Sequence, residues 1–223
     1  MVDDNSTDDT AARVQLAAAA DPRMRLHWAP KLPPGWGGKM HACHEGALQA
    51  RHPVLLFLDC DVRVAAGAMA GYLRRTGVAL ASGFPRQQTG TPGEALLIPL
   101  IHVVLLGYLA LPGMRLSHHP GFGAGCGQVM VADAAAYRAV GGHAAIRGSW
   151  HDGLHLPRAF RRHGQRTDIF DAAPLATCRM YRGLAETWQG LAKNARAGMA
   201  TPAALPVWTL LLGGGVAALL APG

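Results

Sequence analysis

The stretch that most constrains the fold is Val54–Asp61, which reads Val-Leu-Leu-Phe-Leu-Asp-Cys-Asp. Five consecutive apolar residues followed by acids are typical of a strand that is buried on both faces, as in a parallel sheet. In open α/β folds ligands bind at the carboxyl ends of the strands, so Asp59 and Asp61 stand where a cation and a phosphate can be held. The alternative is that one of these acids begins a turn or caps a helix near residues 65–74.

Strand and helix patterns alternate along the rest of the chain. Short strands are expected at residues 24–28, 78–82, 126–131 and 165–170, with helices between them. This alternation predicts an α/β fold with a mostly parallel central sheet flanked by helices. Val2 has the character of the last residue of a strand, and an acidic turn and a helix to about Ala20 follow it. The chain is therefore expected to lack a first βα unit.

The net charge of +7 indicates an acidic partner. The basic residues are not interleaved with aromatic residues and no nucleic-acid motif is present, so nucleic acid is not expected. A membrane surface or a phosphorylated small molecule fits the charge better. The four cysteines lie far apart without a Cys-x-x-Cys pair, which indicates neither a zinc site nor a disulfide framework.

Two uncharged apolar segments suggest a membrane. Residues 205–223 have nearly the length that crosses a bilayer, and we expect a transmembrane helix at 201–223 that the end of the chain cuts short, after a domain at 1–200. Residues 95–112 contain Pro99 and His102, which favour a helix at the membrane interface or a buried core helix. A basic block at 158–196 precedes the apolar tail, so the domain is expected on the cytoplasmic side of the inner membrane.

Two other sites carry candidate functional residues. Glycines at 35, 37 and 38 precede Lys39 and a helix, but Met40 follows Lys39, so the segment is not a P-loop. Lys39 either meets a diphosphate or is a solvated lysine. Asp152 precedes another helix, where an acid is also the usual cap.

Six motifs follow one another over most of the chain: Val-Asp-Asp-Asn-Ser-Thr-Asp at 2–8, Gly-Trp-x-Gly-Lys at 35–39, Leu-Asp-Cys-Asp at 58–61, Val-Gly-Gly-His at 140–143, His-Asp-Gly-Leu-x-Leu at 151–156 and Arg-Met-Tyr-Arg at 179–182. In this order the set resembles the family 2 glycosyltransferases of the GT-A fold. Within them it is similar to the membrane-bound lipid branch, which includes ceramide glucosyltransferase-like, hopanoid and carotenoid glycosyltransferases.

The resemblance implies a role for each matching residue. Asp3 and Asp4 match the acidic turn that contacts the uracil and ribose of a nucleotide sugar, and Lys39 lies near that nucleotide. Asp59 and Asp61 match the Asp-x-Asp pair that holds Mg²⁺ or Mn²⁺ against the diphosphate. Asp152 matches the catalytic base, with His151 in place of the usual Glu. Arg179 and Arg182 match a motif on the diphosphate and acceptor side, in which Gly183 replaces the usual Trp.

The expected function is therefore the metal-dependent, inverting transfer of a sugar from a nucleotide sugar, UDP-linked, to a lipid acceptor. A single base without a second nucleophile favours a single displacement. Two alternatives remain open. One is a truncated, membrane-bound remnant without activity, and the other is a metal-dependent nucleotidyltransferase, which also needs paired carboxylates and a basic phosphate site.

Overall fold

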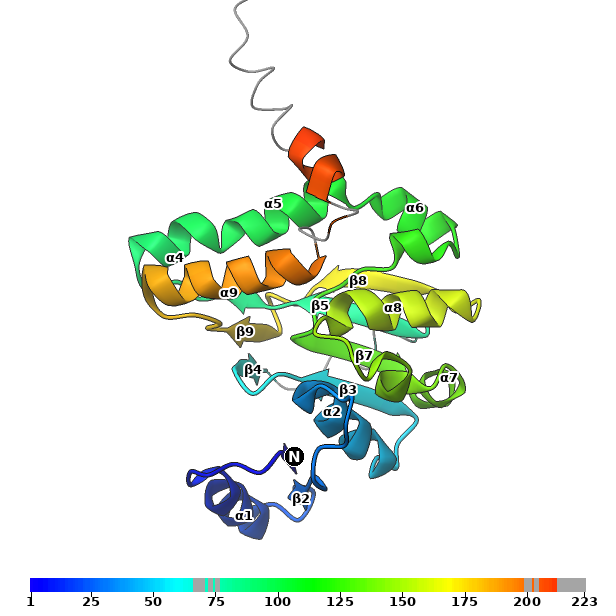
Figure 1. Cartoon of the computed structure of the whole chain (residues 1–223). Helices are drawn as coiled ribbons and strands as arrows, with labels where there is room; N and C mark the ends of the chain where they lie inside the picture. Colours follow the sequence, from blue (N-terminus) through cyan, green and yellow to red (C-terminus); the bar gives the residue numbers. More distant parts are fainter. Residues whose placement is uncertain (66–70, 72–73, 75–76, 199–201, 203–204, 212–223) are drawn as a thin grey trace, which may run out of the picture. The chain divides into compact units, whose positions relative to one another are not determined.

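A computed structural model describes residues 1–65, 71, 74, 77–198, 202 and 205–211 (Figure 1). The chain divides into two units. Unit 1 comprises Met1–Gln87 and Val104–Cys178, and unit 2 comprises Gln88–Val103 and the residues from Arg179 on. Most of the helix expected near residues 65–74 lies outside the described residues.

The central sheet of unit 1 has four strands in the order β3, β7, β5, β8. Their bounds are Val54–Leu58 for β3, Val129–Asp133 for β7, Leu80–Phe84 for β5 and Thr167–Asp171 for β8. β5 and β8 are parallel, whereas β7 is antiparallel to both β3 and β5. The predicted α/β class is confirmed, but the sheet is mixed rather than mostly parallel in its pairings. The apolar pattern of β7 marks a strand and carries no information about its direction.

Burial of β3 differs from the prediction. The strand forms at the predicted residues, but Leu56 and Leu58 are 45% and 41% exposed. Among the described residues β3 pairs with β7 alone and forms an edge of the sheet, so part of its surface has no neighbouring layer. The prediction of a strand buried on both faces is therefore wrong, because an apolar run does not show whether a strand is central or at an edge.

Helices and a second layer cover the central part of the sheet. Along β7, Val129 and Val131 belong to one buried cluster while Met130 and Ala132 belong to the other, so the strand contributes to a core on each face. The larger core also contains Met40, Tyr137, Leu156 and Phe160. These residues come from α2 (Gly38–Leu48), α7 (Ala134–Ala139) and α8 (Asp152–Arg162). Gly141 and Gly164, with φ of 77° and 72°, follow the ends of α7 and α8.

Two smaller sheets complete unit 1. β1 (Val2–Asp3) pairs in parallel with β2 (His27–Trp28), close to where the sequence indicates strands. β4 (Val62–Val64), β9 (Ala176–Cys178) and β6 (Arg86–Gln87) form a three-stranded sheet without a counterpart in the sequence-based expectation. Strands of two or three residues are too short to show an alternating pattern. The remaining elements of this unit are α1 (Thr10–Ala20), α6 (Leu111–Leu116), η1 (Pro120–Phe122) and η2 (Gly142–Ile146).

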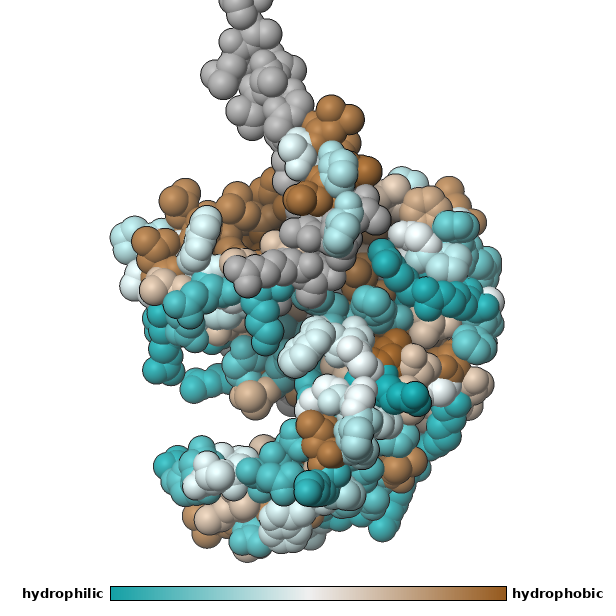
Figure 2. All heavy atoms as spheres, viewed as in Figure 1, coloured by the Kyte–Doolittle hydropathy of each residue, from teal (hydrophilic) through white to brown (hydrophobic). Residues whose placement is uncertain are grey.

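The apolar segment 95–112 is divided among several helices. α4 (Pro92–Leu97) ends just before Pro99, where α5 (Pro99–Tyr108) begins, and in unit 2 α4 packs against α9 (Gly183–Gly198). Leu96, Leu100 and Val103 are more than 45% exposed. Hydrophobic residues gather over α4 and α5 in the space-filling view (Figure 2). This surface excludes the interpretation of 95–112 as an entirely buried core helix.

The predicted transmembrane helix at 201–223 falls largely outside the described residues, because 212–223 are not among them. Residues 205–211 are helical. Within the described part of the chain, no helix combines the length and the apolar character needed to cross a bilayer.

Candidate active site

The Asp59-Cys60-Asp61 segment is a tight turn that joins the central sheet to the three-stranded sheet. The Asp59 N–H donates at 3.1 Å to the carbonyl of Gln128, the residue just before the neighbouring strand β7. The Val62 N–H donates to the Asp59 carbonyl, also at 3.1 Å, and closes the turn before β4 begins. Both acids therefore follow the carboxyl end of β3, as the sequence predicted. The alternative prediction, that one of these acids begins a turn, is also confirmed, because Asp59 begins one.

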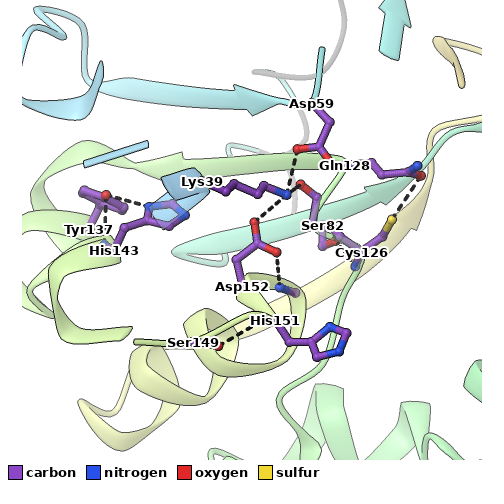
Figure 3. Close-up of polar contacts among 12 residues, drawn as sticks. Lys39, Asp59, Ser82, Cys126, Gln128, Tyr137, His143, Ser149, His151 and Asp152 are labelled. Carbon is purple, nitrogen blue, oxygen red and sulfur yellow. Dashed lines mark hydrogen bonds and ion pairs between the residues drawn. The ribbon is translucent and has the colours of Figure 1, made fainter. Parts of the chain in front are cut away.

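Lys39 connects this turn to the start of α8. Its Nζ lies 2.7 Å from Asp59 Oδ1 and 2.9 Å from Asp152 Oδ2. It also donates to the carbonyl of Gly127 at 3.1 Å. The ammonium has three N–H donors, so each has an acceptor. Figure 3 shows the Lys39 side chain reaching between the two carboxylates. Lys39 and Asp59 are 20 positions apart and Asp59 and Asp152 are 93 positions apart, yet the three side chains meet at one point.

The electrostatics of this cluster depend on its partial burial. Burial lowers the pKa of Lys39, but Asp152 and Asp59 more than reverse that effect and leave the pKa raised. Burial raises the pKa of Asp59, Lys39 lowers it, and Asp152 and Asp61 raise it further, so that the pKa lies above its ordinary value. The cluster therefore consists of a protonated lysine whose positive charge compensates the negative charge of carboxylates that are partly removed from water.

Asp152 is the first residue of α8 and is only 7% exposed. Its Oδ1 accepts the N–H of Gly153 at 2.8 Å, while Oδ2 faces Lys39. The carboxylate is thus fixed by the helix N-terminus on one side and by the ammonium on the other. The imidazole of His151 points away from this contact (Figure 3), and the backbone N–H of His151 donates to Ser149 Oγ at 2.9 Å.

A glycine-rich loop, Gly121–Gly127, brings backbone close to this helix. A Cβ at Gly127 would collide with the Asp152 carboxylate, and a Cβ at Gly123 would lie 2.9 Å from the backbone of Arg158. At Gly125 a Cβ would lie 2.6 Å from the Ser82 side chain. Sequence reasoning did not assign Gly127 or Gln128 to the site, because both contribute through their carbonyl groups.

The two acids of the turn fit a divalent cation. Asp61 Oδ1 is buried and has no hydrogen-bond partner within the described residues, and the Asp61 carboxylate contacts the Cys178 thiol. Carboxylate oxygens are the ligands that Mg²⁺ and Mn²⁺ prefer. The described residues contain no group of three or more His, Cys, Asp or Glu side chains placed to hold a metal. A cation here would therefore take its other ligands from water and from a bound phosphate.

The two N-terminal acids have different surroundings. Asp3 is 5% exposed, and its Oδ1 accepts the N–H of Ser6 at 3.0 Å, so it stabilises the turn that contains Asn5 at φ 61°. Asp4 is exposed, and its Oδ2 lies so close to Gly38 that a Cβ there would be 2.8 Å away. Of the two, Asp4 is the acid beside the helix start that carries Lys39.

Arg179 and Arg182 belong to unit 2 and are held by acids of that unit. Arg179 Nη2 lies 3.6 Å from Glu94 Oε2, and the Arg182 N–H donates to Glu186. Glu94 is fully buried and also accepts from Gly90 N–H, Gly183 N–H and Thr91 Oγ1. The hydrogen bonds from Gly183 and Gly90 lower the pKa of Glu94 to about 2. Sequence reasoning missed Glu94, although Thr91-x-x-Glu94 has the form of a capping box.

Comparison with known proteins gives a family and a fold. The model of glycosyl transferase family 21 matches residues 4–221. The mannosyltransferase PcManGT from Pyrobaculum calidifontis, solved with GDP-Man and Mn²⁺, is 19% identical with a TM-score of 0.56, over 90% of this chain and 55% of that one. TarS 1–349 from S. aureus, solved with UDP-GlcNAc, is 12% identical with a TM-score of 0.50, over 82% and 49%. No curated protein matches.

At these identities the two structures show the fold alone, and the chain spans about half the length of each. The coarser prediction, a glycosyltransferase of the GT-A type, is confirmed. The matching family model is that of family 21, whereas the motif resemblance was to family 2.

Proposed function

The chain belongs to glycosyl transferase family 21 and is a glycosyltransferase, and from this premise we propose that it transfers a sugar from UDP to a membrane lipid with inversion at the anomeric carbon. The observation that carries the proposal is the contact of Lys39 with both Asp59 and Asp152. It places a candidate base, a candidate metal ligand and a cation for the diphosphate within one cluster, as sugar transfer from a nucleotide requires.

Each residue has a distinct task in this proposal. Asp152 accepts the proton of the attacking hydroxyl, since one of its oxygens is fixed by the Gly153 N–H and the other faces the cluster. Asp59 and Asp61 hold Mg²⁺ or Mn²⁺, which when bound neutralises charge on the leaving diphosphate. Lys39 binds the phosphates, and Arg179 and Arg182 of unit 2 are separate candidates for substrate binding. Asp4, with Asp3 ordering the turn beside it, contacts the nucleoside.

Inversion follows from the number of carboxylates available. With Asp59 and Asp61 assigned to the cation, Asp152 is the carboxylate left for the acceptor side, so a single displacement is the simplest path. Asp152→Asn keeps the shape of the side chain and removes the base. We expect transfer to be lost while UDP binding, measured by calorimetry, stays within about threefold of the natural protein. A parallel loss of UDP binding would instead make Asp152 a structural residue.

The lipid acceptor and the membrane rest on the exposed apolar side chains of α4 and α5. Leu96, Leu100 and Val103 are 71%, 49% and 61% exposed. Apolar surface of this kind marks an interaction site, and its lack of charge suits the acyl region of a bilayer. We place residues 1–200 as the catalytic domain on the cytoplasmic face of the inner membrane, with the basic block at 158–196 near anionic headgroups. A ceramide- or hopanoid-type acceptor belongs to this same proposal.

Vesicle flotation tests the membrane part. Replacing Leu96, Leu100 and Val103 by Ser should reduce binding to vesicles and transfer to a lipid acceptor. Leu16→Ser with Leu48→Ser is the matched control, because these leucines are 76% and 63% exposed in unit 1. Unchanged vesicle binding by the triple variant, or an equal loss in the control, would contradict membrane docking by α4 and α5.

A further inference from the structure

The cluster around Lys39 contains a conflict between two tasks. Its ammonium is bound to Asp59 Oδ1 at 2.7 Å and to Asp152 Oδ2 at 2.9 Å. The proposed function needs Asp59 as a metal ligand and Asp152 as a proton acceptor. In the arrangement observed, an oxygen of each carboxylate is already occupied by the same ammonium.

Lys39 and a divalent cation cannot share Asp59 Oδ1 at low cost. A Mg²⁺ ion on a carboxylate oxygen lies about 2.0–2.1 Å from it. With Nζ at 2.7 Å from that same oxygen, two positive centres would stand close together in a site where the Asp59 side chain is only 30% exposed. Like charges at such short range repel strongly where water is partly excluded. Lys39 must therefore leave Asp59 before that oxygen can bind a metal.

The side chain of Lys39 can make such a move. Lysine has a flexible four-carbon stem and a point charge, so a new anion can redirect it without a change in the backbone. The Lys39 side chain is 40% exposed, which leaves one side of it open to solvent. The diphosphate of a nucleotide sugar carries two negative charges, as many as the two carboxylates that Lys39 contacts here, and it is the anion expected next to this site.

Building on the proposed function, we propose that the Lys39 ammonium occupies the metal site until a metal ion binds there. Lys39 is thus a positioning residue for both carboxylates. In the arrangement observed, which we call closed, Lys39 bridges Asp59 and Asp152. In the second arrangement, which we call open, the Lys39 side chain turns to the diphosphate of the donor. This movement frees Asp59 for the metal and Asp152 for the acceptor hydroxyl. The metal and the nucleotide therefore bind with positive cooperativity, and the base becomes available after the donor has bound.

Binding of Mn²⁺ alone tests the inference without any sugar transfer. Free Mn²⁺ is followed by electron paramagnetic resonance in titrations with the natural protein, Lys39→Met and Lys39→Gln, each with and without UDP. The natural protein should bind Mn²⁺ weakly alone and about tenfold more tightly with UDP. Both variants should bind Mn²⁺ alone about tenfold more tightly than the natural protein, and UDP should add much less to their affinity.

The controls separate competition from a general charge effect. Lys31→Met removes an exposed lysine of the same unit and should leave both affinities unchanged. Lys39→Arg keeps the positive charge and should keep Mn²⁺ binding weak in the absence of UDP. Lys39→Arg also tests the proposal if neither neutral variant folds. If UDP does not tighten the binding of Mn²⁺ to Lys39→Arg, the proposed exchange of the lysine for the metal at Asp59 is contradicted.

The outcomes distinguish this inference from the proposed function. If the natural protein binds Mn²⁺ with UDP but the neutral variants bind Mn²⁺ alone no better than it does, Lys39 does not compete with the metal and the inference is wrong. If no form binds Mn²⁺ even with UDP, the metal dependence of the proposed function is wrong as well. Tighter Mn²⁺ binding in both neutral variants with unchanged binding in Lys31→Met supports the exchange.

Discussion

The buried pair of Tyr137 and His143 supports the two helices that carry the site. Tyr137 lies in α7 and is 4% exposed, and His143 lies in η2 and is 0% exposed. The Tyr137 hydroxyl accepts the His143 backbone N–H at 3.0 Å and lies 2.8 Å from His143 Nδ1. The direction of the bond between the hydroxyl and Nδ1 depends on the tautomer of the imidazole, because the hydroxyl oxygen has two lone pairs and one proton. η2 packs against both α2 and α8.

Tyr137→Phe should destabilise the fold through the groups that it leaves unpaired. The His143 N–H and Nδ1 would both lose their partner in a buried site, and each unsatisfied group costs about 1–3 kcal/mol. Allowing for some relaxation, the free energy of unfolding should fall by about 3 kcal/mol. For a chain of this length the melting temperature should then fall by roughly 6–12 °C.

Urea denaturation followed by circular dichroism measures the loss, and a double-mutant cycle identifies its cause. His143→Leu removes Nδ1, so adding Tyr137→Phe to it should cost about 1 kcal/mol less than in the natural protein. A loss of less than about 0.5 kcal/mol for Tyr137→Phe alone, or strict additivity in the cycle, would refute the reasoning.

Three other perturbations should have distinct outcomes. Burial lowers the pKa of His143 to about 4 from an ordinary value of about 6.5, so stability should fall by roughly 3 kcal/mol as the pH drops from 6.5 to 4, and His143→Leu should lose that dependence in urea titrations. Gly127→Ala should displace the Asp152 carboxylate and lower kcat about 100-fold in transfer assays, whereas Gly148→Ala, whose Cβ makes only an ordinary contact, should not. The pKa of Glu94 is lowered to about 2, so its stabilising contribution should be lost as the pH falls from about 4.5 toward 2. Glu94→Gln should weaken this dependence in thermal melts.

The sequence predicted the elements that are long and strongly patterned. β3 is marked by five apolar residues between Pro53 and two acids, and α8 is marked by Asp152 at its start and Gly164 after its end. Periodicity within a helix or strand says nothing about residues as far apart as Lys39, Asp59 and Asp152. Only the order of the motifs, through the family resemblance, related these three residues to one site.

Other features have no signature in the side chains. The reversed direction of β7 arises from tertiary pairing, which an apolar run does not encode. Gly127 and Gln128 contribute carbonyl oxygens, which every residue has. Glu94 differs from these, because its capping box with Thr91 is visible in the sequence, whereas its contacts with Gly183 and Arg179 form only in the folded chain.

The loop from Gly121 to Gly127 has a consequence for engineering this enzyme. At Gly123, Gly125 and Gly127 the space for a methyl group is already filled by α8 or by Ser82. A library that varies this loop to admit new acceptors would therefore lose most of its members at these positions, whatever residue is introduced. Diversity is better placed on the exposed side chains around the cluster, where shape can change without separating the loop from the helix that carries Asp152.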